Sequence, residues 1–496
     1  MINTIYRFIT GKRFVPAIIL LCAIAFLASL FHRYIYIDDA WFGEQAYWFS
    51  RLGHVKTSTI IDFYGWDERL FVYHKLNIII GALLIKIFGW SPEPLRIFTL
   101  LVFLLFLFII YKVLKSPAFN SGLVKSRLVF FFLIVNPLTL LYAFTYRPEI
   151  LVMTLGFSSF LLLTVKQNLK NLIYAAILAG TAMLVHLNGV MYMVAGFGLL
   201  LTRKQWKSAI VFGFASAVVG SLYFYDLWQP GHFNTFLHQI RHWPDNITTN
   251  YKAVGWLSYN VAALMKLGNE HQRFFWSPDV WGLSGTFVIA LILKGKTLWR
   301  KHKELILYLL FADIGLNILG SHIAEIYMLL LMPFLAIIAA SFLSELRKNA
   351  KPYLQFIGII LILFQAGTAV NRLTEIFGRM ENTVSLSAEM LSGFPENNGR
   401  VLVPYRFIYN QLPEKQLVSY KTMEYHQVEN GKKFSKDEFL ALALRLNIRY
   451  MVVPPEMLSE NKMYPWMNEE FRDFENKHRY IKLKISQNPL GLVRVD

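Results

Sequence analysis

The stretch YIYIDDAWFGEQAYW (residues 34–48) decides how the sequence is interpreted, because it leaves a long apolar run and at once presents two adjacent carboxylates. Asp38 and Asp39 are followed by Glu44, and four aromatic residues lie among them: Trp41, Phe42, Tyr47 and Trp48. Charged side chains beside a membrane-length segment are costly and usually have a function. The stretch raises two questions: whether the chain spans a membrane, and what the carboxylates do at its boundary.

The composition is that of a membrane protein. The chain has 496 residues, of which 55% are hydrophobic and 17% charged, and its mean hydropathy is +0.40. A soluble domain is at most about half apolar. The net charge of +18 does not indicate nucleic acid as a partner, because the basic residues form short clusters between apolar runs and not one patch. The composition predicts a polytopic α-helical membrane protein surrounded by membrane lipids.

About eleven apolar runs are long enough, or nearly so, to span a membrane. They lie near residues 14–31, 95–114, 128–146, 148–165, 171–186, 188–202, 208–226, 280–294, 304–320, 323–343 and 353–370. Another run, 76–89, is short, and Lys75 and Lys86 flank or interrupt it. If it lies along the membrane surface, the Lys and Arg clusters between the other runs all fall on the side of the N-terminus, as cytoplasmic loops do. We therefore expect a retained first helix with a cytoplasmic N-terminus, and a juxtamembrane helix at 76–89.

This topology predicts three outer regions: the loops 32–94 and 227–279, and the C-terminal region from residue 371. Hydropathy falls sharply there, and four segments read as strands: RVLVPY (400–405), RYMVVPP (449–455), YIKLKI (480–485) and GLVRVD (491–496). The segment DEFLALALRLN (437–447), which follows Ser435 as a capping residue, predicts an amphipathic helix. We expect a membrane domain, 1–370, and a small periplasmic α/β domain, 371–496.

Two interpretations of the carboxylate pair stay open on this stretch alone. Asp38 and Asp39 are either interfacial groups that keep the first helix from sliding inward, with Trp and Tyr as an aromatic belt, or a general base at the lipid–water boundary. A carboxylate in a partly apolar site is suited to accept a proton from a hydroxyl group.

Other polar residues at the same boundary favour the second interpretation. They are Lys75 in VYHKLN (72–77), Arg147 and Glu149 in TYRPEI (145–150), and His186 in LVHLNG (184–189). Cations there can hold a phosphate group. Each also has a simpler explanation: Lys75 snorkels, Arg147 and Glu149 form an ion pair between two helices that Pro148 separates, and His186 caps a helix turn.

In this order the motifs resemble those of the membrane glycosyltransferases of the GT-C fold class, which include protein O-mannosyltransferases, the aminoarabinose transferases of lipid A and RgtA/B/C/D-like proteins. IDDAWFGEQA (37–46) is similar to the family's acidic pair followed by a small residue, an aromatic residue and a Glu. HKLN keeps the family's Lys at Lys75 without the two prolines that follow it. YRPE matches an Ala-Arg-Pro-Asp element, with Glu149 in place of Asp, and LVHLNG a His-Pro-x-Gly element, with Leu187 in place of Pro. FGWSPEPLRIFT (88–99) and IYMLLLMPFLAII (326–338) resemble two further segments, so the resemblance covers roughly residues 10–370.

The resemblance implies an inverting glycosyltransferase that moves a sugar from a polyprenyl-phosphate donor to a hydroxyl of a lipid or protein acceptor. It would act at the periplasmic face of the bacterial inner membrane. Asp38 takes the place of the catalytic base and Asp39 that of its acidic neighbour. Lys75, Arg147 and His186 take the place of ligands of the donor phosphate, while Glu44, Glu149 and His74 would orient the acceptor or the cations. Because cationic side chains can neutralise the leaving phosphate, neither a metal ion nor a cofactor is expected.

Two further features of the sequence have plain explanations. The loop 227–279 contains His238 and His242 at helical spacing, but we prefer a substrate-covering loop or a solvated surface over a zinc site. Asn246 begins a formal glycosylation sequon in the same loop. The only cysteine, Cys22, lies in the first apolar run, so no intrachain disulfide is possible.

Three other functions stay open. A transporter or flippase would place its charges near the middle of the membrane. A polysaccharide polymerase or ligase would use Arg and His residues of a late outer loop such as 227–279. A non-catalytic assembly partner would dock through the C-terminal domain. The sugar and the acceptor are not specified: lipid A, lipopolysaccharide core, another glycolipid and protein Ser or Thr all fit.

Overall fold

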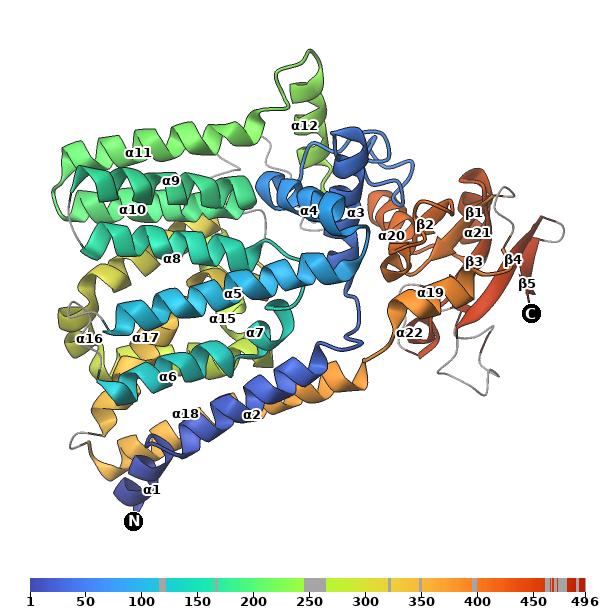
Figure 1. The fold of residues 1–496 in the computed structure, drawn as a ribbon. Coiled ribbons are helices and arrows are strands. Elements are labelled where there is room, and N and C mark those ends of the chain that lie inside the picture. The colour runs from blue at the N-terminus through green and yellow to red at the C-terminus, as the bar shows by residue number, and fades with distance from the viewer. Residues whose placement is uncertain are drawn as a thin grey trace.

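The computed structural model is a helical bundle joined at one end to a mixed α/β region (Figure 1). It describes residues 1–115, 122–165, 168–244, 265–319, 323–347, 350–394, 399–459, 464, 466–467, 471, 480–487 and 490–495.

The helical part contains α1 Ile2–Ile9, α2 Phe14–Ser29, α3 Ile37–Leu52, α4 Lys75–Phe88, α5 Pro92–Lys115, α6 Leu123–Ile134, α7 Pro137–Tyr142, α8 Glu149–Val165, α9 Leu169–Val185, η1 Leu187–Gly189, α10 Val190–Thr202, α11 Trp206–Ser221, η2 Leu222–Phe224, α12 His232–Arg241, α15 His271–Phe275, α16 Pro278–Leu319, η3 Glu325–Tyr327, α17 Met328–Leu346 and α18 Pro352–Gly378. The α/β region contains α19 Thr383–Leu391, β1 Arg400–Val403, η4 Tyr405–Ile408, β2 Leu417–Ser419, α20 Tyr420–Asn430, α21 Lys436–Arg445, β3 Ile448–Val453, α22 Pro455–Ser459, β4 Ile481–Gln487 and β5 Leu490–Arg494.

α17 forms the centre of the bundle. Its residues from Met328 to Leu343 are all buried, and it packs against α16, α6 and α8. α2 and α18 lie side by side along one edge (Figure 1), and just beyond them the backbone N–H of Glu381 donates to the carbonyl of His32 at 2.8 Å. The chain therefore enters the loop 32–94, the first predicted outer loop, and its C-terminal region at neighbouring points.

The predicted apolar runs all contain helix, but the predicted count of spans is not confirmed. Among the described residues, five helical segments are long and apolar enough to cross a membrane, and a sixth candidate is a pair of helices bent by 106° at residues 275–278. Three apolar helices, 149–165, 169–185 and 187–202, are shorter. The predicted span 128–146 is divided, because Asn136 caps a new helix that has Pro137 at its first position. The runs 280–294 and 304–320 are both parts of α16, whose backbone departs from helical geometry at Lys294 and His302.

The C-terminal region contains a five-stranded sheet in the order β2-β1-β3-β4-β5. β1 runs parallel to β2 and β3, while β4 pairs antiparallel with both of its neighbours, β3 and β5. The four predicted strands correspond to β1, β3, β4 and β5, and Ser435 caps α21, which begins at Lys436, in a capping box with Glu438. α18 runs through residue 370 to Gly378. The side of the membrane on which this region lies stays a prediction.

The first outer loop and the C-terminal region share one apolar core around α3. The Tyr409 ring stacks on Trp90 with centroids 4.5 Å apart, and its hydroxyl donates to the carbonyl of Asp39 at 2.6 Å. This approach needs a glycine, because a Cβ at Gly43 would lie 2.2 Å from the Tyr409 hydroxyl oxygen. α3 is therefore held by the bundle on one side and by the α/β region on the other.

The Gly43→Ala variant tests this contact. We expect it to destabilise the fold by about 1–3 kcal/mol, because the Tyr409 ring must move away from α3. The control is Gly285→Ala in α16, where an added Cβ has no neighbour within 4 Å and where alanine favours the helix by up to about 1 kcal/mol. Thermal unfolding of the purified, detergent-solubilised protein measures both; equal unfolding temperatures for the two variants would contradict the predicted contact.

Candidate active site

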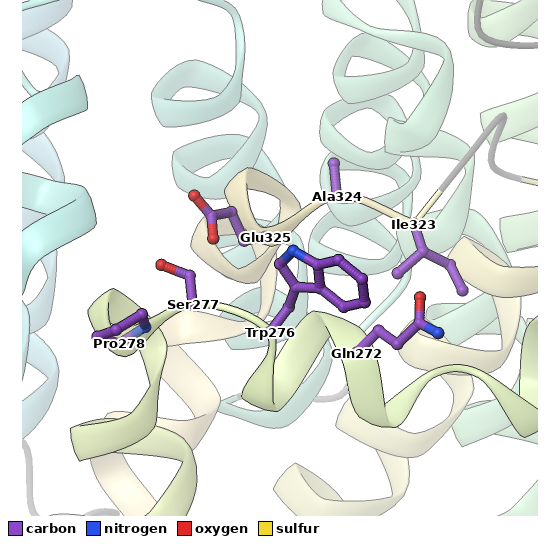
Figure 2. Close-up of a pocket in the computed structure, with 7 residues that line it drawn as sticks. All are labelled: Gln272, Trp276, Ser277, Pro278, Ile323, Ala324 and Glu325. Carbon is purple, nitrogen blue, oxygen red and sulfur yellow. The ribbon is translucent and has the colours of Figure 1, made fainter. Parts of the chain in front are cut away.

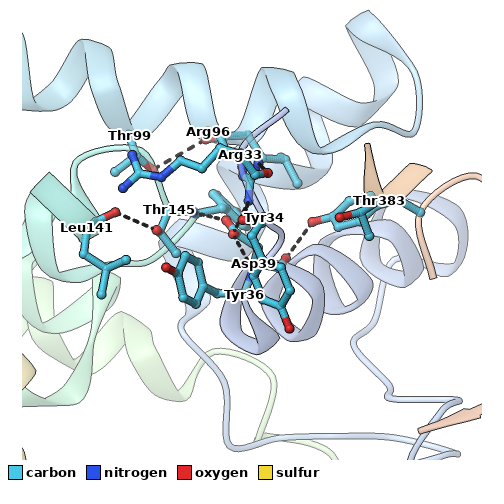
Figure 3. A network of polar contacts seen from close by, with 12 residues as sticks. Arg33, Tyr34, Tyr36, Asp39, Arg96, Thr99, Leu141, Thr145 and Thr383 are labelled. Carbon is cyan, nitrogen blue, oxygen red and sulfur yellow. Dashed lines mark hydrogen bonds and ion pairs between the residues drawn. The ribbon is translucent and has the colours of Figure 1, made fainter. Parts of the chain in front are cut away.

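Asp39 is a buried anchor at the start of α3 (Figure 3). Its side chain has no exposed surface. Oδ2 accepts a hydrogen bond from Arg96 Nη2 at 2.7 Å, and Oδ1 accepts one from the backbone N–H of Tyr146 at 2.6 Å. The N–H of Tyr36 donates to Oδ2 at 3.2 Å and completes a capping box. Asp39 therefore ties α3 to α5 and to the segment before α8, and both of its oxygens are used for this purpose.

Asp38 is the accessible member of the predicted acidic pair. Neighbouring residues of a helix point about 100° apart, so the side chain of Asp38 faces a different surface from that of Asp39. Its side chain is 33% exposed, against 0% for Asp39 and 1% for Glu149. Of these three carboxylates, Asp38 is the most accessible to a substrate.

Arg147 joins Asp38 to Glu149. Its Nε and Nη2 donate to the two oxygens of Glu149 at 3.0 and 2.7 Å, and its Nη1 donates to Asp38. Burial opposes the charged guanidinium, but Asp38 and Glu149 outweigh it and raise the pKa of Arg147 well above its ordinary value. The simpler explanation of Arg147 and Glu149, an ion pair at a helix start, is thus correct, and the same pair also reaches Asp38.

His74 and His186 stack on each other beside this cluster. Their ring centroids are 4.2 Å apart, and His74 also contacts Phe42 at 4.9 Å. Nδ1 of His186 accepts a hydrogen bond from the N–H of Asn188 at 2.9 Å. Burial, and then His186 and Arg147, hold the pKa of His74 well below its ordinary value. His186 therefore caps a turn through Nδ1, and the surroundings of His74 disfavour its charged form.

Lys75 points away from this cluster toward Asp226, which follows η2. Nζ donates to both oxygens of Asp226 at 2.8 and 2.7 Å and to the carbonyl of Phe71 at 3.0 Å. The Lys75 side chain is 2% exposed. Burial outweighs the attraction of Asp226 and lowers the pKa of Lys75 to about 8. Lys75 therefore does not snorkel to the membrane surface. Its contact with a donor phosphate stays a prediction, and such a contact requires the pair of Lys75 and Asp226 to open.

Asp226 is a candidate site residue that the sequence-based predictions do not include. It is an isolated acid at the outer end of the apolar run 208–226, in YFYDLW, which is the same signal that identified Asp38. What the sequence does not contain is the pairing, because Lys75 and Asp226 are 151 residues apart.

Glu44 forms hydrogen bonds inside the protein, whereas the sequence predicts that it orients an acceptor or the cations. It is fully buried. Oε1 accepts from the Ser58 hydroxyl at 2.9 Å and from the N–H of Thr59 at 3.0 Å, while Oε2 accepts from Thr59 Oγ1 at 2.6 Å and from the Tyr405 hydroxyl at 2.7 Å. Burial raises the pKa of Glu44, and these hydrogen bonds act against the rise. Glu44 thus binds the first outer loop and the C-terminal region to α3.

The other candidate ligands do not converge. In the described part of the chain, no three side chains of His, Cys, Asp or Glu are grouped so as to hold a metal ion. The rings of His238 and His242 pack on Tyr64, with centroids 5.2 and 4.5 Å away. Asn246 lies outside the described residues. Independence of a metal stays a prediction.

Neutralising the two aspartates should destabilise the protein to very different extents. Asp39→Asn leaves the Arg96 guanidinium buried without its counter-ion, so we expect a loss of about 3–5 kcal/mol and less protein in the membrane. Asp38→Asn removes a partly exposed partner of Arg147, and we expect a loss of at most about 1 kcal/mol. Thermal unfolding of both purified variants checks this. Equal losses would show that Asp39 is not the anchor.

The Lys75–Asp226 pair should behave as a coupled unit. Asp226→Asn removes the counter-ion of a buried ammonium group, and we expect a loss of about 3–5 kcal/mol at pH 6. The pKa of folded Lys75, about 8, lies below its ordinary value, so the folded chain releases this proton first and stability from this group rises with pH above 8. The deficit of Asp226→Asn should therefore shrink as the pH rises from 6 to about 8 and stay constant at higher pH, because neutral lysine needs no counter-ion. The double variant Lys75→Met, Asp226→Leu should recover most of the loss at pH 6, and failure to recover would contradict the coupling.

Comparison with known proteins identifies the fold. No family model matches the chain, and no curated protein sequence matches it. Among solved structures, ArnT from Cupriavidus metallidurans bound to undecaprenyl phosphate is similar, with a TM-score of 0.56 and 12% identity over 89% of this chain and 93% of that chain. The same protein in the apo state gives a TM-score of 0.53 and 11% identity, with the same coverage. The Archaeoglobus fulgidus oligosaccharyltransferase tethered with an acceptor peptide gives 0.55 and 10% identity, over 98% of this chain and 75% of that chain. At such identities the likeness concerns the fold, and the chain has the GT-C fold of membrane glycosyltransferases.

Proposed function

We propose that the chain is an inverting glycosyltransferase that moves a sugar from a polyprenyl-phosphate donor to an acceptor hydroxyl, with Asp38 as the general base. The reaction takes place at the periplasmic face of the bacterial inner membrane. The observation that carries the proposal is the arrangement of Asp38: it is a partly exposed carboxylate on a helix that buried contacts hold rigidly, in contact with Arg147. The GT-C fold and the apolar helices of the bundle support it.

Arg147 connects the donor and the base in this mechanism. Glu149 holds Nε and Nη2, so the orientation of the guanidinium is fixed while Nη1 contacts Asp38. A donor phosphate that binds Nη1 takes the place of Asp38 and supplies the negative charge that Arg147 requires. Asp38 is then free to bind the acceptor hydroxyl. Phosphate binding and release of the base are therefore one event.

The chemical step follows from this arrangement. Asp38 takes the proton of the acceptor hydroxyl as its oxygen attacks the anomeric carbon on the face opposite the phosphate. The bond between that carbon and the phosphate oxygen breaks, and the electron pair leaves with the polyprenyl phosphate. Arg147 stabilises the charge of the leaving phosphate, with His186 as a further ligand of that phosphate. The configuration of the anomeric carbon is inverted.

Known structures of the same fold support a lipid-linked donor. One structure of ArnT holds undecaprenyl phosphate, and one of the Archaeoglobus fulgidus oligosaccharyltransferase is a complex with an inhibitory peptide and a dolichol-phosphate. For this chain, a lipid or a protein acceptor both fit the proposal, and neither a metal ion nor nucleic acid takes part. A transporter, a flippase, a polymerase or an assembly partner is the alternative if the base proves dispensable.

The test compares envelope glycolipids and glycoproteins by mass spectrometry in four strains: wild type, deletion, Asp38→Asn and Glu68→Gln. Glu68 is an exposed carboxylate of the same outer loop and serves as the control. In the deletion strain, we expect one glycosylated species to be replaced by a species that is lighter by a single sugar. In Asp38→Asn, we expect the amount of the complete species to fall by about 100-fold or more, with the variant protein still in the membrane. Glu68→Gln should resemble wild type. If the deletion alters the profile and Asp38→Asn does not, Asp38 is not the base and transport or assembly is the better account.

A further inference from the structure

A cavity of about 660 Å³ opens where α15, the start of α16 and η3 meet. Gln272, Trp276, Ser277, Ile323 and Glu325 are among its lining residues. Figure 2 shows the indole of Trp276 between Glu325 on one side and Ile323 and Gln272 on the other. A volume of this size is in the range of cavities that bind small molecules.

Three polar side chains of this cavity have no partner among the described residues, while the Ser277 hydroxyl accepts a hydrogen bond from the N–H of Asp279 at 3.3 Å. No hydrogen bond or ion pair between described residues engages the Glu325 carboxylate, the Gln272 side-chain amide or the Trp276 indole N–H, and Trp276 is 73% exposed. The cation next to them is already bound: Arg273 is 1% exposed and donates to both oxygens of Glu270. The described lining therefore has a negative charge at Glu325 and no cation.

The cavity adjoins the proposed active site. Tyr327, which ends the turn that begins at Glu325, contacts the ring of His186 with centroids 5.6 Å apart. On the other side of the cluster, the Arg147 guanidinium lies 5.6 Å from the centroid of the Tyr142 ring. The turn that lines the cavity therefore also borders the cluster at which the proposal places the phosphate.

These properties fit a sugar ring. An exposed indole offers an electron-rich face to the polarised C–H groups of a ring, and a free carboxylate and amide accept hydrogen bonds from hydroxyl groups. A phosphate does not fit, because the described residues of the lining include no cation to neutralise it. The sugar of a polyprenyl-phosphate donor is joined directly to its phosphate, and a phosphate at Arg147 places that sugar next to Tyr142 and the cavity.

We propose that this cavity binds the sugar of the lipid-linked donor, with Trp276 against one face of the ring and Glu325 and Gln272 on its hydroxyl groups. The inference rests on the proposed function and specifies how the donor sugar is selected. A plainer role for Trp276 is that of an interfacial anchor in the membrane, and the experiment separates the two.

The test measures the affinity of the purified full-length protein in nanodiscs for six lipids. One is undecaprenyl phosphate, and the others carry glucose, galactose, mannose, N-acetylglucosamine or arabinose on that phosphate. We expect wild type to prefer at least one sugar-bearing lipid over the bare phosphate. Trp276→Ala and Glu325→Gln should each weaken binding of that lipid by about tenfold and leave binding of the bare phosphate unchanged.

The control is Trp281→Ala. Trp281 is on α16, is 41% exposed, and its indole N–H donates to the carbonyl of Phe275 at 2.6 Å. It is not among the residues that line the cavity, so the preference for a sugar should persist in this variant. If the six lipids bind wild type equally, or if Trp276→Ala weakens them all equally, the cavity does not bind the donor sugar.

Failure of this inference is distinguishable from failure of the proposed function. If Asp38→Asn abolishes sugar transfer in cells while Trp276→Ala and Glu325→Gln leave all six affinities unchanged, the enzyme stands and the sugar cavity does not. If the two cavity variants lose the sugar preference while Asp38→Asn leaves the glycan profile intact, the cavity binds a sugar-bearing lipid in a protein that is not this transferase.

Discussion

The arrangement of the site depends on one buried ion pair, between Asp39 and Arg96. A carboxylate without contact to water must have its charge compensated and its lone pairs filled, and Asp39 meets both needs with Arg96 and the backbone N–H of Tyr146. Arg96 belongs to α5, and Tyr146 directly precedes Arg147 in the chain. Satisfying the Asp39 carboxylate therefore fixes the position of α3 relative to Arg147, so Asp38 and Arg147 meet because their neighbours in the chain are held together.

Four cations around the site follow a similar principle and have an acid each, whereas the buried Arg33 donates to the carbonyl of Leu140. Arg96 has Asp39, Arg147 has Glu149 and Asp38, Lys75 has Asp226, and Arg273 has Glu270. Asp38 differs from the other acids because it is the second carboxylate on a cation that already has one. A competing anion is able to displace it at small cost, whereas displacement of Glu149 or Asp39 would leave a charge buried and unpaired.

Local features of the sequence were sufficient to predict local structure. The apolar runs, the capping Ser435 and the alternating strands depend on neighbouring residues, and the acidic pair with its downstream motifs was enough to identify the GT-C fold. The division of 128–146 was also readable, since Asn136-Pro137 is a helix-start signal. The partners were not readable: Asp39 meets Arg96 across 57 residues, Lys75 meets Asp226 across 151 and Tyr409 meets Asp39 across 370. Charge alone does not tell which cation a buried acid meets, so the pairing of Lys75 with Asp226 and the hydrogen bonds of Glu44 to Thr59 and Tyr405 are not predictable from the sequence.

The bonds from Tyr405 and Tyr409 to α3 have a consequence for the order in which the protein is made. Both tyrosines are synthesised after every helix of the bundle, and they complete contacts to residues near the start of the chain. A ribosome that has finished α18 has supplied all the helices of the bundle but not the segment that secures α3. Early and late parts of the chain must meet before α3 is secured, so biosynthesis delays the finished site until the C-terminal sheet is translated. A prematurely terminated chain would insert its bundle without this support for Asp38.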